Sequence, residues 1–320
     1  MSVTVKIWLV IGAVLVIAGI SVFVWAMSSA EWDLTKLGTV CYVNNTHNIG
    51  EPFDKITLIT DVADAVFIAS DDGSCRVECY ENEKALHSVE VTDGTLRIEV
   101  QDKRAWYDHI GVNLGAPKIT VYLPEKEYAS INVNETTGGV ELAGVLSFGS
   151  IDVETTTGMV VCEASASGKV RIATTTGAVT LNGVSAGSIE ASVTTGRVKA
   201  DSVKCEGEAL ISVATGKTEL TDFSCRELTS NGSTGALKMK NVIVTGKLTA
   251  KRSTGSVYFD ACDASELCVK TSTGDITGSL LTNKQFIAES DTGRVNVPKG
   301  TNGGRCELIT DTGDIRIEIK

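Results

Sequence analysis

Two Asp-Thr-Gly triplets are the first residues in the sequence that could do chemistry. They are Asp291-Thr292-Gly293 and Asp311-Thr312-Gly313, and two such aspartates that share a proton form the catalytic pair of an aspartic protease. The two triplets, however, occupy the same phase of a longer repeat, in which other copies carry Thr175 or Ser233 in place of the aspartate. We therefore interpret both aspartates as turn residues of that repeat and expect no protease activity.

Metal ligands are sparse along the sequence. Four aspartates could hold Ca²⁺ loosely between stacked turns, but their spacing matches no calcium-binding loop and fits a solvated acidic edge better; they are Asp275, Asp291, Asp311 and Asp314. The three histidines, at positions 47, 87 and 109, are far apart, and the chain has no Cys-x-x-Cys motif. The sequence predicts no metal site and no cofactor.

Nine cysteines leave at least one thiol unpaired if the others form disulfides. Cys205 and Cys225 each follow a Thr-Gly glycine by nine residues, in adjacent copies of the repeat. Stacked copies would bring the two Cα atoms to about 5 Å, within the range of a disulfide. We therefore predict a Cys205–Cys225 disulfide, whereas Cys162 and Cys306 fall on inward positions and act as small apolar residues.

Basic residues gather on an otherwise acidic chain. The chain has 29 Lys and Arg against 40 Asp and Glu, a net charge of −11, which argues against a nucleic-acid-binding protein. Several basic residues nevertheless fall at outward positions of the repeat or in the acid-free interval 228–259, together with one tyrosine; they are Arg197, Lys199, Lys217, Lys238, Lys251, Arg252 and Tyr258. This stripe is a candidate binding site for teichoic acid, a charged glycan or lipid headgroups, and an ordinary solvated face is the alternative.

The dipeptide Thr-Gly recurs ten times at intervals of 19 or 20 residues. We expect its glycines to occupy strained turns, because glycine adopts conformations that other residues avoid; they are Gly138, Gly158, Gly177, Gly196, Gly216, Gly235, Gly255, Gly274, Gly293 and Gly313. Such a fixed period marks a repeat architecture in which each copy buries its apolar face by stacking on its neighbours.

Apolar and polar residues alternate on both sides of each glycine. Val179 and Leu181 follow Gly177 at two and four positions, and Val170 and Ile172 precede it at seven and five. This alternation predicts short strands with one buried face. A propeller blade needs about 40 or more residues, so the period favours a solenoid. We predict an all-β fold, a single-stranded parallel β-solenoid of about 19–20 residues per coil, with nine or so coils.

A long apolar segment precedes the repeats. Ile7 to Met27 spans 21 residues, about 31 Å as a helix, which is enough to cross a bilayer. Trp8 and Trp25 lie near its ends, and Lys6 precedes it, so the positive-inside rule places the N-terminus in the cytoplasm. A cleavable signal peptide ending near 28–30 is the alternative.

The sequence is thereby divided into five parts. We expect a cytoplasmic stub at 1–6, one transmembrane helix at 7–27, a linker at 28–37, irregular membrane-proximal β coils that cap the rod at 38–135, and the regular Thr-Gly solenoid at 136–320. The last strand, Ile315–Ile319, is expected to be an exposed edge that could pair with another chain.

A family resemblance follows from these motifs. A membrane anchor, the segments DVADAVFIASDDG, DGTLRIEV and ITVYLPEKEYASINV, and serial TTG repeats resemble the bacterial putative-adhesin β-strand-repeat family over roughly residues 50–320. The resemblance implies a β-repeat fold in an envelope protein and a role in surface adhesion, and some members resemble accessory proteins of envelope-stress systems. Its motifs are structural, so no catalytic residue is implied.

The sequence therefore predicts a non-catalytic binding or scaffold protein that displays a β-solenoid outside the membrane. The alternatives are a regulatory partner of a membrane envelope-stress sensor and, more remotely, a polysaccharide-acting enzyme. The near-constant repeat spacing leaves no inserted loops from which an enzyme's cleft could be built.

Overall fold

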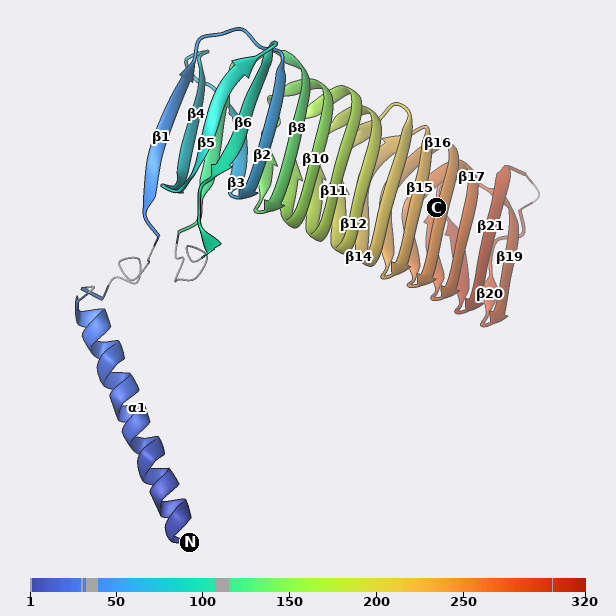
Figure 1. Cartoon of the computed structure of the whole chain (residues 1–320). Helices are drawn as coiled ribbons and strands as arrows, with labels where there is room; N and C mark the ends of the chain where they lie inside the picture. The colour runs from blue at the N-terminus through green and yellow to red at the C-terminus, as the bar shows by residue number, and fades with distance from the viewer. Residues whose placement is uncertain (1, 30, 33–39, 107–114, 301) are drawn as a thin grey trace.

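The computed structural model describes residues 2–29, 31–32, 40–106, 115–300 and 302–320, which form one helix and 22 strands of a single sheet wound into a rod (Figure 1). Helix α1 (Val3–Ser29) contains the segment Val5–Ser29, whose mean hydropathy of 2.8 and length suffice to cross a membrane. Most of the predicted linker 28–37 and the third histidine, His109, lie outside the described residues.

The regular stack begins at residue 127. Its strands are β8 (Glu127–Thr137), β9 (Val140–Leu142), β10 (Ser147–Cys162), β11 (Ser165–Asn182), β12 (Ser185–Asp201), β13 (Lys204–Cys205), β14 (Glu208–Cys225), β15 (Glu227–Thr234), β16 (Leu237–Thr254), β17 (Val257–Thr273), β18 (Ile276–Leu280), β19 (Lys284–Thr292), β20 (Val295–Asn296), β21 (Gly304–Thr312) and β22 (Ile315–Ile319). They pair in parallel, and the Thr-Gly steps stack in register, as Gly158, Gly177 and Gly196 do. The predicted parallel β-solenoid is confirmed.

The Thr-Gly step makes one corner of each coil. Nine of its ten glycines, all but Gly158, have φ between 126° and 156°. The corners also stack backbone on backbone, so a Cβ atom on Gly196 would collide with the carbonyl oxygen of Gly177. Glycine is therefore required at this corner both by conformation and by contact with the preceding coil.

A second corner follows six residues after the glycine, and the sequence analysis did not identify it. Its residues adopt left-handed φ angles of 48° to 67° in five consecutive coils; they are Gly183, Ser202, Asp222, Asn241 and Ala261. The Asn241 amide donates a hydrogen bond to the Asp222 carboxylate at 2.8 Å. Short side chains thus share a strained backbone position that, unlike the first corner, does not exclude a Cβ atom.

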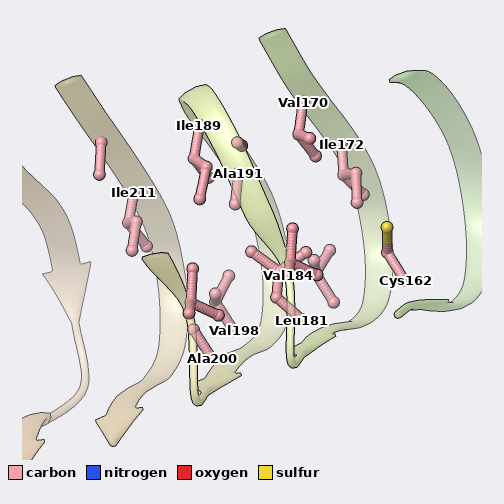
Figure 2. Packing of buried hydrophobic residues seen from close by; sticks show 14 of the residues in the cluster. Cys162, Val170, Ile172, Leu181, Val184, Ile189, Ala191, Val198, Ala200 and Ile211 are labelled. Carbon is pink, nitrogen blue, oxygen red and sulfur yellow. The ribbon is translucent and has the colours of Figure 1, made fainter. Parts of the chain in front are cut away.

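The core is a set of apolar rows that run along the rod. Val170, Ile172 and Leu181 point inward and pack against the equivalent residues of the next coil, among them Ile189 and Ala191 (Figure 2). Each fully buried Val, Ile or Leu side chain contributes about 1.5–3 kcal/mol of transfer free energy. Because each row continues from coil to coil, the core extends along the whole solenoid.

The N-terminal end of the rod departs from the regular stack. Its strands are β1 (Tyr42–Ile49), β2 (Lys55–Val62), β3 (Asp64–Ala69), β4 (Cys75–Asn82), β5 (Ala85–Thr92), β6 (Thr95–Asp102) and β7 (Lys118–Leu123). Strands β2, β3, β6 and β7 pair in parallel as further coils, whereas the ladders β1–β4, β4–β7 and β5–β6 are antiparallel. The sequence predicts only irregular coils here and misses the antiparallel strands. We call residues 42–123 the cap.

At the distal end of the rod, the order of the coils in space differs from their order in the sequence. Strand β21 lies between β17 and β19, and β22 lies between β18 and β20. The prediction that Ile315–Ile319 forms an exposed edge is therefore wrong for Ile315 and Arg316, which pair with β20 of the outermost coil (Figure 1). Among the described strands, none pairs with the outer side of residues 317–319. Val295 on β20 occupies a core row yet is 44% exposed, since no further coil covers it.

Candidate functional site

The predicted basic stripe lies on the outward side of the strand that follows the Thr-Gly corner. Arg197 pairs in register with Lys217, and Lys199 is in one row with Glu219, Lys238 and Tyr258 on successive coils. Lys240 lies two residues beyond Lys238 on β16 and faces outward as well. We call the exposed residues Arg197, Lys199, Lys217, Lys238, Lys240 and Tyr258 the basic face.

The basic face contains two depressions. A cleft of about 220 Å³ is lined by Lys199, Lys238, Lys240 and Tyr258, and by the acidic side chains of Glu219 and Asp260. A shallow groove of about 520 Å³ lies beside it over the first corner, and its lining residues are Gly158, Met159, Gly177, Ala178, Gly196, Arg197, Gly216 and Lys217. The glycines leave a flat backbone floor in this groove, with two cations at one end.

The cations of the basic face have no ion-pair partner among the described residues, a property that they share with the exposed Lys204 and Lys251. Elsewhere on the stack, Arg171 forms ion pairs with Asp152 and Glu154 at 2.8 Å, and Lys247 binds Glu266 at 2.8 Å. Arg197, Lys199, Lys217, Lys238 and Lys240 form no such pair in the part of the chain that the structure describes. Glu219 lies in register between Lys199 and Lys238, and Asp260 lies opposite Lys240, but the five cations outnumber these two acids and can attract an external anion.

The register of the coils also places like charges next to each other. Arg197 and Lys217 face each other across one parallel ladder, about 4.8 Å apart in backbone spacing, and like charges placed directly opposite destabilise a sheet. A bound anion between them would convert this repulsion into attraction. The arrangement therefore favours a ligand with negative charges repeated along its length.

Two residues of the predicted stripe are not on the basic face. Lys251 and Arg252 precede the Thr-Gly corner of their coil, whereas Lys238 and Tyr258 follow the corners of theirs. The two pairs therefore lie on different sides of the rod's corner. Lys251 is exposed, but Arg252 is 6% exposed and sits in register with Gly232, whose missing side chain provides the space for the guanidinium group. Arg252 is thus a buried residue, which corrects its assignment to the binding stripe.

Polar groups of the core hold Arg252 in place. Its guanidinium donates hydrogen bonds to the Ser230 carbonyl at 3.0 Å, to the Ser230 hydroxyl at 2.9 Å and to the Thr218 hydroxyl at 3.4 Å. Burial lowers the pKa of Arg252 to about 10. These contacts join three neighbouring coils and give Arg252 a structural role.

The aspartates of the two triplets lie on adjacent coils at the distal end. Thr292 and Thr312 pair in register, so Asp291 and Asp311 are neighbours, and both are exposed. The nearby Asp275 carboxylate accepts a hydrogen bond from the backbone N–H of Asp314 at 2.8 Å. The Asp314 carboxylate in turn accepts one from the N–H of Arg294 at 2.9 Å. Asp275 and Asp314 therefore cap the backbone of the next coil.

Cys205 and Cys225 lie in adjacent coils, next to the paired residues Lys204 and Ser224. All nine cysteines are free thiols in the structure. Burial raises the pKa of Cys205, and it raises that of Cys225 to about 12. The disulfide between them remains a prediction for the oxidised protein.

Several buried ionisable residues were not predicted from the sequence. Glu81 and His87 in the cap are 1% and 6% exposed, and Glu135, where the cap meets the regular stack, is 2% exposed. A signal for Glu81 exists in the sequence, because it shares the inward face of β4 with Cys75, Val77 and Cys79. An acid that continues an apolar row is a sign of a buried, partnered carboxylate.

Comparison with known proteins identifies related sequences and folds. A family model described as Toastrack DUF4097 matches residues 53–318. No protein among the curated proteins matches this chain.

Several crystal structures are similar to this chain at low sequence identity. A putative lipid binding protein from Parabacteroides distasonis is 18% identical, with 74% of this chain and 95% of that chain covered and a TM-score of 0.49. A putative adhesin from Bacteroides fragilis is 15% identical, with 87% and 97% covered and a TM-score of 0.41. A putative adhesin from Parabacteroides merdae is 14% identical, with 75% and 98% covered and a TM-score of 0.48. These similarities are too low to transfer a function.

Proposed function

The chain belongs to the Toastrack DUF4097 family, and from this premise we propose that it is a non-catalytic binding protein of the cell envelope that holds an anionic wall polymer on its basic face. The observation that carries the proposal is the set of five exposed cations without ion-pair partners among the described residues. They lie on three consecutive coils of a chain whose net charge is −11.

The shape of the basic face supports a linear ligand. On one strand, outward residues lie about 7 Å apart, and neighbouring coils lie about 4.8 Å apart. Arg197, Lys199, Lys217, Lys238 and Lys240 occupy this grid with no inserted loop above it. A polyanion can therefore lie across several coils and contact cations from each, as a chain of phosphates or carboxylates would.

Helix α1 supports a location at the membrane. We propose that it anchors the chain with the N-terminus in the cytoplasm and the solenoid outside, because Lys6 precedes the apolar segment and Glu31 and Asp33 follow it. The anchor would keep the basic face close to the membrane-proximal layers of the envelope. A sensor protein in the same membrane is the competing partner.

The proposal is tested by binding of the full-length chain, purified in detergent, to fluorescent poly(glycerol phosphate), measured by anisotropy at low and high salt. The reversal K199E/K217E/K238E should weaken binding at least about tenfold, and high salt should weaken the wild type similarly.

The matched control reverses three lysines that are already paired on the same rod. Lys169, Lys247 and Lys270 bind Glu190, Glu266 and Glu307 at 2.6–2.8 Å, so K169E/K247E/K270E changes the net charge equally without touching the basic face. This variant should bind almost as well as the wild type. If both variants lose the same amount of affinity, the effect comes from net charge alone and the site is rejected. If the wild type does not bind the polymer even at low salt, the proposal is rejected and a membrane protein becomes the favoured partner.

A further inference from the structure

The cap contains a second cluster of residues with chemical potential, separate from the basic face. Cys79 and Glu81 on β4 and His87 on β5 each place one ligand atom within 4.8 Å of the other two. Their exposed fractions are 1%, 1% and 6%. A thiol, a carboxylate and an imidazole are thus buried together in the core of an all-β domain.

The orientation of the three side chains is fixed by hydrogen bonds. His87 Nδ1 lies 2.7 Å from Glu81 Oε2, and His87 Nε2 lies 2.9 Å from the Thr60 hydroxyl on β2. Glu81 Oε1 accepts a hydrogen bond from the Asn45 amide at 2.6 Å, and Glu81 Oε2 accepts one from the His87 backbone N–H at 2.6 Å. Each ligand except the thiol is therefore held by a partner outside the cluster.

We propose that Cys79, Glu81 and His87 bind a Zn²⁺ ion that fastens the cap of the solenoid. Thiolate, imidazole and carboxylate are the three ligand types that zinc accepts in proteins. Ca²⁺ and Mg²⁺ require sets of oxygen ligands, which a thiol and an imidazole do not supply. The donor set therefore selects a borderline or soft divalent cation over a hard one.

The ion would take the position of the proton between His87 and Glu81. With bonds of about 2.0–2.1 Å and a tetrahedral angle at the metal, coordination by His87 Nδ1 and Glu81 Oε2 needs these atoms to separate from 2.7 Å to about 3.3 Å. Binding would release that proton, when present, together with the proton of the Cys79 thiol. The thiolate and the carboxylate then balance the two positive charges of the ion.

The outer contacts suit this arrangement. When Nδ1 binds the metal, Nε2 carries the proton and donates it to the Thr60 hydroxyl, and such a partner fixes the tautomer of a ligating histidine. A cavity of about 60 Å³ borders Thr60, Glu81 and His87 and has room for a water molecule as fourth ligand. Arg104, which also lines it, is held by Asp102 at 2.6 Å and 2.8 Å.

The position of the cluster explains what the ion would do. Strand β4 pairs with β1 and β7, and β5 pairs with β6. The turn at residues 83–84 connects β4 to β5, but among the described strands no ladder of backbone hydrogen bonds joins the two. A metal held by Cys79, Glu81 and His87 would cross-link these two strands. The cap would gain a fastening that its hydrogen-bond ladders lack.

The experiment uses the full-length chain in detergent, stripped of metal with a chelator and kept reduced, and titrates it with Co²⁺ and then with Zn²⁺. The wild type should bind one equivalent of Co²⁺, develop a thiolate-to-cobalt charge-transfer band, and lose the band as Zn²⁺ displaces Co²⁺. Zn²⁺ should also raise the unfolding temperature.

Three variants identify the ligands. C79A should lose the charge-transfer band, and the conservative T60V should bind Co²⁺ about 10–100-fold more weakly because it removes only the partner of His87. C75A is the matched control, since Cys75 is a buried thiol on the same face of β4, and it should keep the band. The proposal fails if the wild type binds no Co²⁺, if C79A keeps the band, or if T60V binds as tightly as the wild type.

Discussion

The regular stack and the cap bury different kinds of side chain although they belong to one sheet. In the stack, each coil repeats one glycine corner, and its inward rows are mostly apolar. In the cap, antiparallel strands replace part of the coil, and Thr60, Glu81 and His87 are buried as a hydrogen-bonded group. Repetition satisfies the backbone without side chains. The stack therefore buries single polar residues such as Arg252 and Lys284, whereas the cluster of a thiol, a carboxylate and an imidazole occurs where the repeat is interrupted.

The basic face shows where the regular stack can vary in sequence. The stack constrains its glycine corner and its inward rows, and it leaves the outward residues of each strand free to vary. Lys199, Lys217 and Lys238 can therefore replace neutral residues without altering the fold. The candidate site on the stack therefore lies on its surface, whereas the candidate site in the cap is buried.

The largest loss of stability is expected from a substitution that disrupts the repeat itself. Gly196→Ala adds a Cβ atom that collides with the Gly177 carbonyl oxygen and is strained at a φ of 144°. Since the backbone of two coils would have to separate, we expect a loss of about 3 kcal/mol or more in the free energy of unfolding. The measurement is urea unfolding followed by circular dichroism.

The second corner supplies the matched control. Gly183 has a left-handed φ of 67°, but no atom lies within 4 Å of an added Cβ, and Asn tolerates this conformation. Gly183→Asn should change stability by less than about 1 kcal/mol. Similar losses in the two variants would show that conformation, and not the stacking of corners, makes glycine necessary.

The two corners also show what the sequence can reveal. The first corner accepts only glycine, because contact between coils excludes a Cβ atom, so it leaves a signature that predicts the solenoid. The second accepts Gly183, Ser202, Asp222 and Ala261 alike, so no single residue type marks it. The sequence therefore reveals the period of the coil but only one of these two turns.

Other features depend on neighbours that are distant in the sequence. Arg252 is buried because Gly232, in the preceding coil, leaves a space beside it, and no local pattern reports this. The crossed order at the distal end depends on the pairing of β21 with β17, two strands separated by β18, β19 and β20 in the sequence, and no local pattern reports this either. Glu81 and His87 are close in the sequence, but the residues that hold them in the core, Asn45 and Thr60, are 36 and 27 residues away, so no local pattern reports the buried cluster.

An intermediate effect on stability is expected from a disulfide that joins two coils. Mild oxidation of the full-length chain should form the Cys205–Cys225 disulfide and stabilise the stack by about 3 kcal/mol, as expected for a closed loop of about 20 residues. Oxidation should be slower than that of the exposed Cys41, because burial raises the pKa of Cys225 to about 12 and leaves little thiolate. Peptide mapping without reductant identifies the bond.

Cys205→Ser serves as the control for this bond. The variant should show no gain in stability on oxidation. A different pairing in the wild type, or no gain from the correct one, would contradict the predicted stacking of these two thiols.

The smallest expected effect lies where the two regions meet. Glu135 on β8 pairs with Thr60 of the cap on one side and with Thr155 of the stack on the other. Burial, reinforced by the nearby charge of Asp64 and only partly opposed by the Ala63 backbone, raises the pKa of Glu135 to about 8. The folded state therefore holds this proton at pH values where the unfolded state has released it.

The sign of the pH dependence follows from this difference. Between the ordinary pKa of a glutamate and about 8, the folded chain binds more protons than the unfolded chain, so its stability falls as the pH rises through this interval. Glu135→Gln keeps the shape and removes the titration, and it should stabilise the chain by about 1–3 kcal/mol above pH 8 with little change in acid. Unfolding temperatures across this range provide the measurement, and Glu141→Gln, at an exposed position of β9, is the control that should retain the wild-type slope. If Glu135→Gln retains that slope as well, Glu135 is ionised in the folded protein, and the junction between cap and stack tolerates a buried charge.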